Sequence, residues 1–393
     1  MHIDFNSSPG PSLGIEVELE VVDQATGALA SAATEMLTEL GAPHPDGEHP
    51  KAKHELFECT VEIITGVCQS VAEARADLEA TLAEVRGAAD RRGLTVMCSG
   101  THPFSCWRDQ QVSPNPRYAR LIHDMQWMAK RLQIFGVHVH VGIRSPEKAV
   151  AIANALAGYI PHLLALSASS PYWEGRDTGL ASSRSKVFEG LPTAGLPAPI
   201  ENWADFEQFM ETLVSSAAIS TVREVWWDVR PHPDFGTVEL RMCDGIPTMS
   251  EICAVAAVAQ SMVTWLDALI DRGYTLPRHR EWILRQNKWR AGRHGLDTEV
   301  IIDERGGLRP LRSAVEDMLE ELSPSARKLG CETELARVEG ILRGGPSYVR
   351  QRAAASAAAA DGGEADLRPV VDLLVREMET DVPGAPAPGG ARP

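Results

Sequence analysis

Several features that would assign this chain to a common class are missing from its sequence. The seven cysteines include no C-x-x-C pair, which argues against a disulfide framework and favours a reducing compartment. The 38 Lys and Arg residues face 54 Asp and Glu, a formal net charge of −16, and this balance argues against a nucleic-acid-binding surface or one that binds an anionic membrane. The N-terminal stretch "MHIDFNSSPG" has neither a basic start nor an apolar core, so we expect no signal peptide. We expect no apolar run to reach the roughly 18 residues of a membrane helix, and we expect a cytoplasmic protein with no membrane partner.

Two familiar nucleotide-binding loops are also missing. Neither a Walker A sequence nor a G-x-G-x-x-G sequence occurs in the chain. A nucleotide would therefore have to be bound by residues other than those of the two glycine-rich loops.

Strand-like and helix-like segments alternate along the chain. Strand patterns cover 13–22, 55–65, 94–99, 135–143, 224–230 and 236–243. Helical signals cover 71–92, the Ser145–Pro146 start and the capping box of Thr248 with Glu251, and the chain reads as helical from 312 onward. The segments 102–118 and 171–200 read as loops. We predict an α+β fold in which one sheet face packs on helices and the other face stays polar and open.

The chain shows no internal repeat and no strong domain boundary before about residue 376. We expect 1–376 to form a single catalytic domain and the tail 377–393, rich in Pro, Gly and Ala, to be disordered.

The polar faces of the strands carry the chemistry. In "LGIEVELEVV" the apolar residues share one face, and Glu16, Glu18 and Glu20 share the other. An ordinary half-exposed strand is the alternative, but three carboxylates on one face repel unless a cation lies opposite. Further polar residues follow the same parity in later strands. These are Glu58, Thr60 and Glu62, then His138 and His140, then Asp228, Arg230 and His232, and finally Glu239 and Arg241.

Two details of these strands stay open. Glu55 has the wrong parity to join Glu62 unless a bulge intervenes or Glu55 lies just before the strand. The intervening "PHPDFG" is able to turn the chain between the last two strands and make them a hairpin. In the loop 171–200, Arg184 and Lys186 are expected to face a ligand.

If these strands share one sheet, its open face is a bed of carboxylates, imidazoles and guanidiniums. Carboxylate oxygens suit Mg or Mn, and Arg beside such a metal suits a phosphoryl group in transfer. The residues therefore predict metal-assisted phosphoryl chemistry on an open sheet, without naming a substrate.

Seven segments, taken together and in order, resemble a known family. They are "GIEVELE", "ELFECTVEIITG", "GVHVHVGI", "SSRS", "WWDVRP", "TVELRMCD" and "NKWRAGRHGLD". The set resembles the carboxylate–amine ligases of the glutamate–cysteine ligase type 2 family, over about 12–376. This family belongs to the glutamine synthetase/guanidino kinase-like fold group, so the resemblance implies a curved, mainly antiparallel sheet with the active site on its concave face.

The resemblance also implies the reaction. ATP phosphorylates a carboxylate, an amine attacks the acyl phosphate, and ADP and phosphate leave. The implied cofactor is Mg or Mn with ATP as co-substrate. The implied partners are small molecules, namely ATP, glutamate or a related amino acid, and an amine such as cysteine, while a homo-oligomer stays open.

The implied site residues fall into three groups. The implied metal ligands are Glu16, Glu18, Glu62, His138 and Glu239. The implied catalytic residues are Arg241, facing the phosphoryl group, and Glu239. The implied contacts to substrate or ATP are Arg184, Arg230, His140 and Glu55. Glu20 matches no position of the family motif and is expected to face water, and Asn287 and Arg290 could equally hold an edge of the sheet.

Three alternatives accompany this interpretation. The acid or amine of a specialised pathway could replace glutamate or cysteine. A guanidino kinase-like phosphotransferase would use the same sheet and release a stable phosphorylated product. A non-catalytic metal- or nucleotide-binding module would bind Mg–ATP without turnover.

Overall fold

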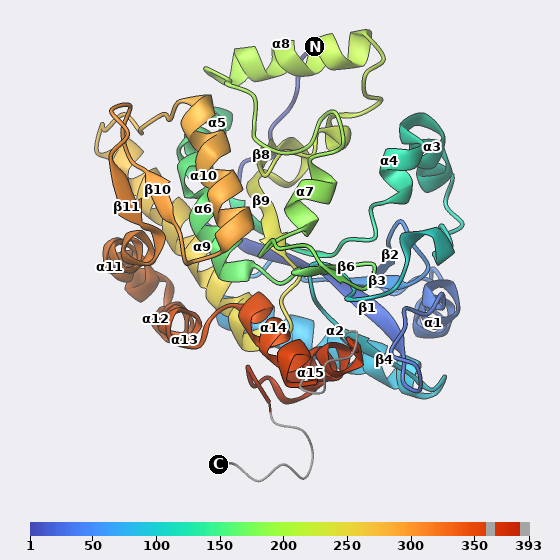
Figure 1. Cartoon of the computed structure of the whole chain (residues 1–393). Helices are drawn as coiled ribbons and strands as arrows, with labels where there is room; N and C mark the ends of the chain where they lie inside the picture. The colour runs from blue at the N-terminus through green and yellow to red at the C-terminus, as the bar shows by residue number, and fades with distance from the viewer. Residues whose placement is uncertain (359–365, 386–393) are drawn as a thin grey trace.

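A computed structural model of the chain describes residues 1–358 and 366–385 (Figure 1). Within them, seven strands form the central sheet, in the order β2-β3-β1-β5-β9-β8, with β4 pairing to the second half of β1. Every pair of neighbouring strands is antiparallel. The strands are β1 (Leu13–Asp23), β2 (Ala52–His54), β3 (Thr60–Ile64), β4 (Leu94–Met97), β5 (Gly136–Gly142), β8 (Val229–His232) and β9 (Thr237–Asp244). Two small ribbons are β6 (Tyr172–Trp173) with β7 (Arg176–Asp177), and β10 (Glu299–Ile301) with β11 (Leu308–Pro310).

One face of this sheet is covered by helices, as the fold class predicted. α2 packs on β1, β3 and β4, α9 packs on β5, and α5 and α6 pack on β9. The helices up to α8 are α1 (Ala33–Gly41), α2 (Val71–Asp90), α3 (Pro116–Met125), α4 (Trp127–Lys130), α5 (Pro146–Leu156), α6 (Ile160–Ser167), α7 (Arg184–Phe188) and α8 (Trp203–Ser215). The later ones are α9 (Met249–Asp271), α10 (Glu281–His294), α11 (Leu311–Leu329), α12 (Glu332–Ala336), α13 (Val338–Gly344), α14 (Ser347–Ala358) and α15 (Arg368–Thr380).

The parity of β1 explains how the core is built. Ile15, Val17, Leu19 and Val21 are at most 1% exposed and belong to the largest apolar cluster. Because alternate side chains point to opposite faces, the intervening glutamates must lie on the other face of the sheet.

The predicted helix starts are confirmed. Ser145 Oγ accepts the backbone N–H of Lys148 at the start of α5, and Thr248 Oγ1 accepts that of Glu251 at the start of α9.

Two core segments correct one expectation from the sequence. Pro146–Ser167 and Met249–Asp271 are long and apolar enough to cross a membrane, each with a mean hydropathy of 1.6. The expectation that no apolar run reaches this length is therefore wrong. In the fold, 72% of each window is buried, because α5, α6 and α9 lie between the sheet and the outer helices and contact apolar side chains on most sides.

The predicted strands exist, but some of their bounds shift. The expected strand 55–65 is shorter in the structure, because 55–59 connect β2, which ends at His54, to β3, which starts at Thr60. The expected loop 102–118 already contains the start of α3, where Asn115 Oδ1 accepts the N–H of Arg117. The expected hairpin of β8 and β9 is confirmed, and Gly236, with φ of 64°, closes its turn.

The C-terminal boundary lies later than expected. Helix α15 continues to Thr380, and Glu377 is fully buried against Arg350, with Nε to Oε1 at 2.7 Å. Asp381 then accepts the N–H of Ser250 at the start of α9 (2.6 Å). The part of the predicted disordered tail before residue 386 is therefore ordered by these polar contacts, and 386–393 lie outside the described residues.

Candidate active site

A cavity of about 660 Å³ lies on the polar face of the sheet. All ten residues proposed for the site from the sequence line it. They are Glu16, Glu18, Glu55, Glu62, His138, His140, Arg184, Arg230, Glu239 and Arg241. The sheet thus brings together side chains that are up to 225 positions apart along the chain (241 minus 16).

Strand register sets the order of these side chains across the sheet. Glu18 on β1 faces Glu62 on β3, and Glu16 faces His138 on β5. His140 then faces Glu239 on β9. Because directly opposed residues lie about 5 Å apart, the register produces one continuous polar row with carboxylates toward β3 and arginines toward β8.

The β3 end of the row holds three crowded carboxylates. Ligand oxygens of Glu18, Glu55 and Glu62 lie within 4.8 Å of one another. Glu55 directly follows β2 and lies in the segment between β2 and β3, so the alternation within β3 does not apply to it and its side chain lines the cavity. Burial, with the neighbouring Glu55, raises the pKa of Glu18 to about 8. Burial together with Glu16, Glu55 and Glu18 also raises the pKa of Glu62 well above its usual value.

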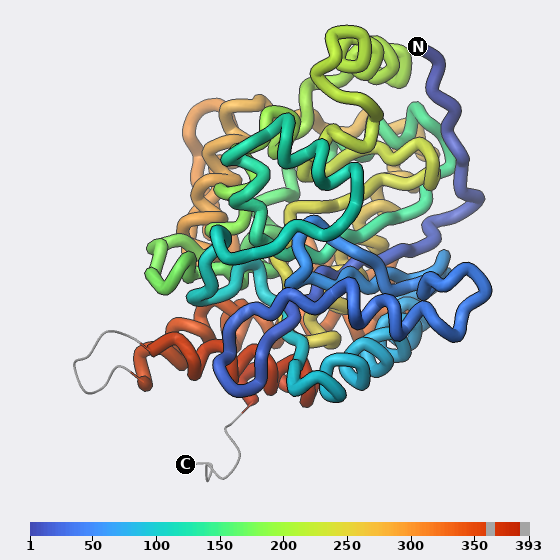
Figure 2. Tube along the Cα trace, turned by 90° about the vertical axis from the view of Figure 1, so that its right-hand side faces the viewer, coloured from blue at the N-terminus to red at the C-terminus, as the bar shows by residue number. Residues whose placement is uncertain are grey.

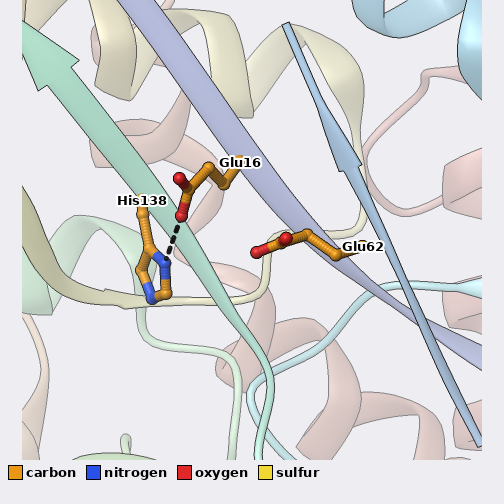
Figure 3. A group of neighbouring side chains, drawn as sticks. All are labelled: Glu16, Glu62 and His138. Atoms are coloured by element: carbon orange, nitrogen blue, oxygen red, sulfur yellow. Dashed lines mark hydrogen bonds and ion pairs between the residues drawn. The ribbon is translucent and has the colours of Figure 1, made fainter. Parts of the chain in front are cut away.

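The centre of the row pairs a carboxylate with two imidazoles. Glu16 Oε2 lies 3.1 Å from His138 Nδ1, and Glu16 Oε1 lies 3.3 Å from His140 Nε2. Figure 3 shows the side chain of Glu62 pointing from β3 toward Glu16 and His138. Burial opposes ionisation of Glu16, but its bonds to both histidines outweigh burial and lower its pKa. Burial and the nearby Arg241 lower the pKa of His138 to about 4, so this imidazole is neutral and suited to bind a cation.

The β8 end of the row holds the guanidiniums. Arg230 Nε donates to Glu239 Oε2 at 2.7 Å, and Arg241 donates to Glu239 Oε1. Burial disfavours the Glu239 carboxylate, but Arg230 and Arg241 outweigh it and hold its pKa well below the usual range. A break in register between β5 and β9 places both Arg241 and Met242 opposite His138, and such a bulge aims a side chain away from the regular pleat.

Arg184, the first residue of α7, lines the cavity, and neighbouring residues fix its position. Its guanidinium approaches the carbonyl of Arg241 (3.4 Å), and its buried Nε has no partner among the described residues. Asp244 accepts hydrogen bonds from the hydroxyls of Ser170 and Ser182 at 2.7 and 2.8 Å. Ser170 Oγ in turn accepts the N–H of Arg184. The sequence analysis did not predict this serine cluster, although the segment "SSRS" contains one of its members, Ser182.

Three expectations about single residues are wrong. Lys186 does not line the cavity, because its Nζ pairs with Glu189 at 2.8 Å. Glu20 does not face water: it is fully buried, bonds to Ser99 Oγ at 2.7 Å, and burial raises its pKa to about 8. Glu58 lies outside the row, because its carboxylate accepts the N–H and hydroxyl of Thr34 in the first turn of α1.

The segment "NKWRAGRHGLD" serves the framework. Asn287 donates to the carbonyl of Ile301 and accepts its N–H, at 2.9 and 2.8 Å. Arg290 donates to the carbonyl of Glu299, so both residues hold the edge of β10. Lys288, 2% exposed, pairs with Asp228 at 2.6 Å and thereby links α10 to the start of β8.

Two groups of apolar side chains also line the cavity, one from the segments around α3 and one from the segments around α7, and Figure 1 shows these two helices apart from each other on the same side of the sheet. The group around α3 consists of Leu56, Tyr118, Leu121, Met125, Leu132 and Ile134. The group around α7 consists of Phe188, Leu191, Ala217, Ala218, Ile219 and Trp226. Figure 2 shows α3 and α4 crossing in front of the sheet from the second direction. No sequence pattern marked these residues, because they come from short or irregular segments without periodicity.

The residues of the row fit a divalent metal. Three overlapping groups each place their ligand atoms within 4.8 Å. These are Glu16, Glu62 and His138, then Glu16, His140 and Glu239, and then Glu18, Glu55 and Glu62. The buried Nε2 of His138 has no hydrogen-bond partner among the described residues. Hard oxygen donors with an imidazole beside them suit Mg or Mn. Glu239 is the weakest member, because guanidinium groups already contact both of its oxygens.

Comparison with known proteins decides the family. The family described as Glutamate-cysteine ligase family 2 (GCS2) matches residues 12–370. The chain belongs to glutamate-cysteine ligase family 2. Its relatives in this family are similar over their full length. A Frankia casuarinae protein named "Putative glutamate--cysteine ligase 2-1" is 57% identical over 98% of this chain and 99% of its own. A Thermobifida fusca protein named "Putative glutamate--cysteine ligase 2" is 49% identical over 100% of this chain and 96% of its own.

Solved structures show the same fold for this member of glutamate-cysteine ligase family 2. A glutamate–cysteine ligase from Francisella tularensis in complex with AMP superposes with a TM-score of 0.61 at 14% identity, over 96% of this chain and 90% of that one. A bifunctional glutathione synthetase from Pasteurella multocida gives a TM-score of 0.65 at 15% identity, over 94% of this chain and 52% of that one. At these identities the likeness concerns the fold alone, and it confirms the predicted mainly antiparallel, open sheet.

Proposed function

We propose that this protein is an ATP-dependent carboxylate–amine ligase that forms an amide bond, with glutamate as the acid, through an acyl phosphate. The observation that carries the proposal is the polar row itself. A trio of half-buried carboxylates lies at one end of a single open sheet face, and two arginines paired to Glu239 lie at the other. Family membership supports the ligase class, and the AMP complex of the Francisella tularensis enzyme supports ATP as the co-substrate.

The reaction has two balanced steps. A substrate carboxylate oxygen bonds to the γ-phosphorus of ATP while the bond from that phosphorus to the β–γ bridging oxygen breaks, and ADP leaves. The amine nitrogen then bonds to the acyl carbon, the bond from that carbon to the phosphate oxygen breaks, and the nitrogen loses a proton. A bound magnesium would supply charge neutralisation of the phosphate oxygens.

The residues of this chain would bind and orient the substrates. Glu16, Glu18, Glu55, Glu62 and His138 would hold the cation. Glu239 fixes the planes of Arg230 and Arg241, so that Arg241 presents donors to the transferred phosphoryl group without reorganisation. Arg184, whose Nε is free within the described structure, would bind an anionic oxygen of ATP or of the acid.

The amine is cysteine or another amine in this proposal, since nothing in the row distinguishes them. The partners are small molecules. The cytoplasmic location and a homo-oligomeric state stay predictions.

A phosphate-release assay tests the function. ATP, Mg and glutamate are mixed with a panel of amino acids and amines, and free phosphate and amide product are measured together. We expect phosphate release to require both the acid and the amine, in equal amounts with the amide. A phosphorylated product without free phosphate would indicate a phosphotransferase instead. Calorimetric binding of Mg–ATP with no turnover for any pair would indicate a non-catalytic binding module.

A further inference from the structure

One carboxylate that lines the cavity does not belong to the polar row. Glu224 comes from the segment just before β8 rather than from a strand. Arg230 Nη1 donates to the carbonyls of Arg223 and Val225, on either side of this residue, at 3.1 and 2.6 Å. Thr193 Oγ1 donates to the carbonyl of Glu224 itself at 2.6 Å. The backbone of Glu224 is therefore fixed directly to the arginine end of the row.

The side chain of Glu224 makes no ion pair within the part of the chain that the structure describes. Its Oε2 accepts the N–H of Ser220 at 3.0 Å, and its Oε1 has no such partner there. The other cavity carboxylates have assigned contacts. Glu16 contacts two imidazoles, Glu239 contacts two guanidiniums, and Asp124 pairs with a neighbouring arginine at 3.5 Å. The groups able to hold a metal contain the carboxylate trio but not Glu224, which leaves this carboxylate available to an organic cation.

The ligase proposal, on which this inference rests, brings two amino groups into the cavity. The acceptor amine must lose its proton before it attacks the acyl carbon, and a carboxylate beside it would oppose that loss because it favours the ammonium form. The α-ammonium of glutamate takes no part in the reaction and stays charged throughout. Glu224 is therefore suited to the ammonium of the acid, while the reacting carboxylate of the same molecule lies near Arg241.

We propose that Glu224 binds the α-ammonium of the acid substrate and thereby selects glutamate over carboxylic acids that lack an amino group. The ammonium donates a charge-assisted hydrogen bond to Oε1 of Glu224. The hydrogen bond from Ser220 and the fixed backbone orient this carboxylate before the substrate binds, which reduces the entropic cost of binding. An acid without the ammonium leaves the carboxylate unpaired and has a lower kcat/KM.

Three acids that share the reacting carboxylate test the proposal on the full chain. Each is mixed with ATP, Mg and cysteine, or with the most active amine of the panel. Glutamate carries both α-groups, glutarate lacks the α-ammonium, and 4-aminobutyrate lacks the α-carboxylate. We expect kcat/KM for glutamate to exceed that for glutarate at least about tenfold. Equal values for these two acids would overturn the proposal.

Paired variants assign the effect to one side chain. Glu224→Gln keeps an acceptor for the N–H of Ser220 and loses the charge. We expect kcat/KM to fall about tenfold or more for glutamate and 4-aminobutyrate, and to stay unchanged for glutarate. Glu73→Gln is the matched control, because Glu73 accepts the N–H of Gln69 with the same spacing, at 2.7 Å, but lies outside the cavity. It should keep all three values.

Two other outcomes for Glu224→Gln would contradict the proposal. An equal fall for all three acids would indicate a structural role. A rise in KM for the amine alone would place the acceptor, and not the acid, beside this carboxylate.

A binding measurement separates this inference from the ligase proposal. Absence of ATP-dependent phosphate with every amine would contradict the ligase function alone. Calorimetric titration of glutamate and glutarate into the enzyme with Mg–ADP requires no turnover. Tighter binding of glutamate, lost in Glu224→Gln, supports the role of Glu224. Equal binding of the two acids, or a preference that survives in Glu224→Gln, contradicts it even if phosphate release is normal.

Discussion

At the scale of single residues, the carboxylate trio sets function against stability. Glu62 is half-buried beside Glu18 and Glu55, and its pKa is raised by desolvation and by the neighbouring carboxylates of Glu16, Glu55 and Glu18. Glu62→Gln removes a charge from the trio, so we expect turnover to fall about 100-fold or more while the free energy of unfolding without metal stays equal or rises by about 1 kcal/mol. Phosphate release at saturating Mg and urea unfolding with EDTA measure the two effects.

Glu58→Gln is the matched control for this variant. Its carboxylate binds the first turn of α1 and lies outside the cavity. We expect it to lose about 1 kcal/mol of stability, as a weakened helix cap does, and to keep its turnover. Full Mg-dependent activity in Glu62→Gln would remove this residue from the metal site.

Arg241 is expected to act through its fork of donors. The guanidinium contacts Glu239 while its buried Nε has no partner among the described residues. Arg241→Lys keeps the charge but loses the planar geometry, so kcat should fall about 100-fold or more. Steady-state kinetics measure this fall, with Arg144→Lys as the control, because Arg144 pairs with Asp267 outside the cavity. A normal kcat in Arg241→Lys would exclude a catalytic role.

His102 makes stability depend on pH outside the site. Its Nε2 donates to the carbonyl of Gly27 and its Nδ1 accepts the N–H of Ser105, so the ring must be neutral. Burial lowers its pKa to about 3. The neutral ring therefore stabilises the fold fully above the unfolded-state pKa of about 6.5, and this stability is lost as pH falls toward 3, by about 1.4 kcal/mol per unit.

Urea unfolding between pH 7 and pH 4 tests this sign. The destabilisation caused by His102→Gln should shrink as the pH falls. The exposed control His2→Gln should behave like the unchanged protein. A difference between His102→Gln and the unchanged protein that is independent of pH would contradict the neutral, buried assignment.

The alternation of side chains within strands predicted most residues of the polar row, but it did not predict which residues of the same parity lie outside the row. Glu16, Glu18, His138 and Glu239 follow the period of two, so their face could be read directly. Glu20 shares that parity yet is buried against Ser99, because β4 pairs beside it and the chain that leaves β4 brings Ser99 onto the same face. A local pattern contains no information about which neighbour lies above a face.

At the scale of elements, α10 stabilises the position of β10 through side-chain hydrogen bonds. Asn287 makes two hydrogen bonds to the backbone of Ile301 in β10. Asn287→Ala leaves these backbone groups unpaired, so we expect a loss of about 1–3 kcal/mol in stability with turnover per folded molecule unchanged. Chemical unfolding combined with the phosphate-release assay distinguishes the two. A large fall in kcat at full stability would show that this segment belongs to the site.

Helix signals and strand signals were not equally informative. The caps Ser145 and Thr248 marked helix starts correctly because capping is a local interaction. Helix α3 was missed because its first residues lie in a stretch rich in Pro and Ser. The bulge at Arg241 was also missed, since it depends on the partner strand β5 rather than on the sequence of β9.

At the scale of the whole molecule, the C-terminal helix closes the fold. Glu377 pairs with Arg350, which also binds Glu251 at the start of α9. A chain ending at residue 376 leaves Asp381 and Glu377 out of this network, so we expect its free energy of unfolding to fall by about 3 kcal/mol or more. A chain ending at residue 385 keeps these contacts and serves as the control. Equal melting temperatures for both chains would show that the contacts add nothing.

The order of strands in the sheet also has a consequence for folding kinetics. Residues of the polar row come from β1, near the start of the sequence, and from β8 and β9, more than 200 positions later. Contacts this distant in sequence form slowly, and the row is complete only when β9 pairs with β5. Divalent cations should therefore slow unfolding and leave the early folding phases unchanged, because only the finished sheet presents the whole set of ligands to them.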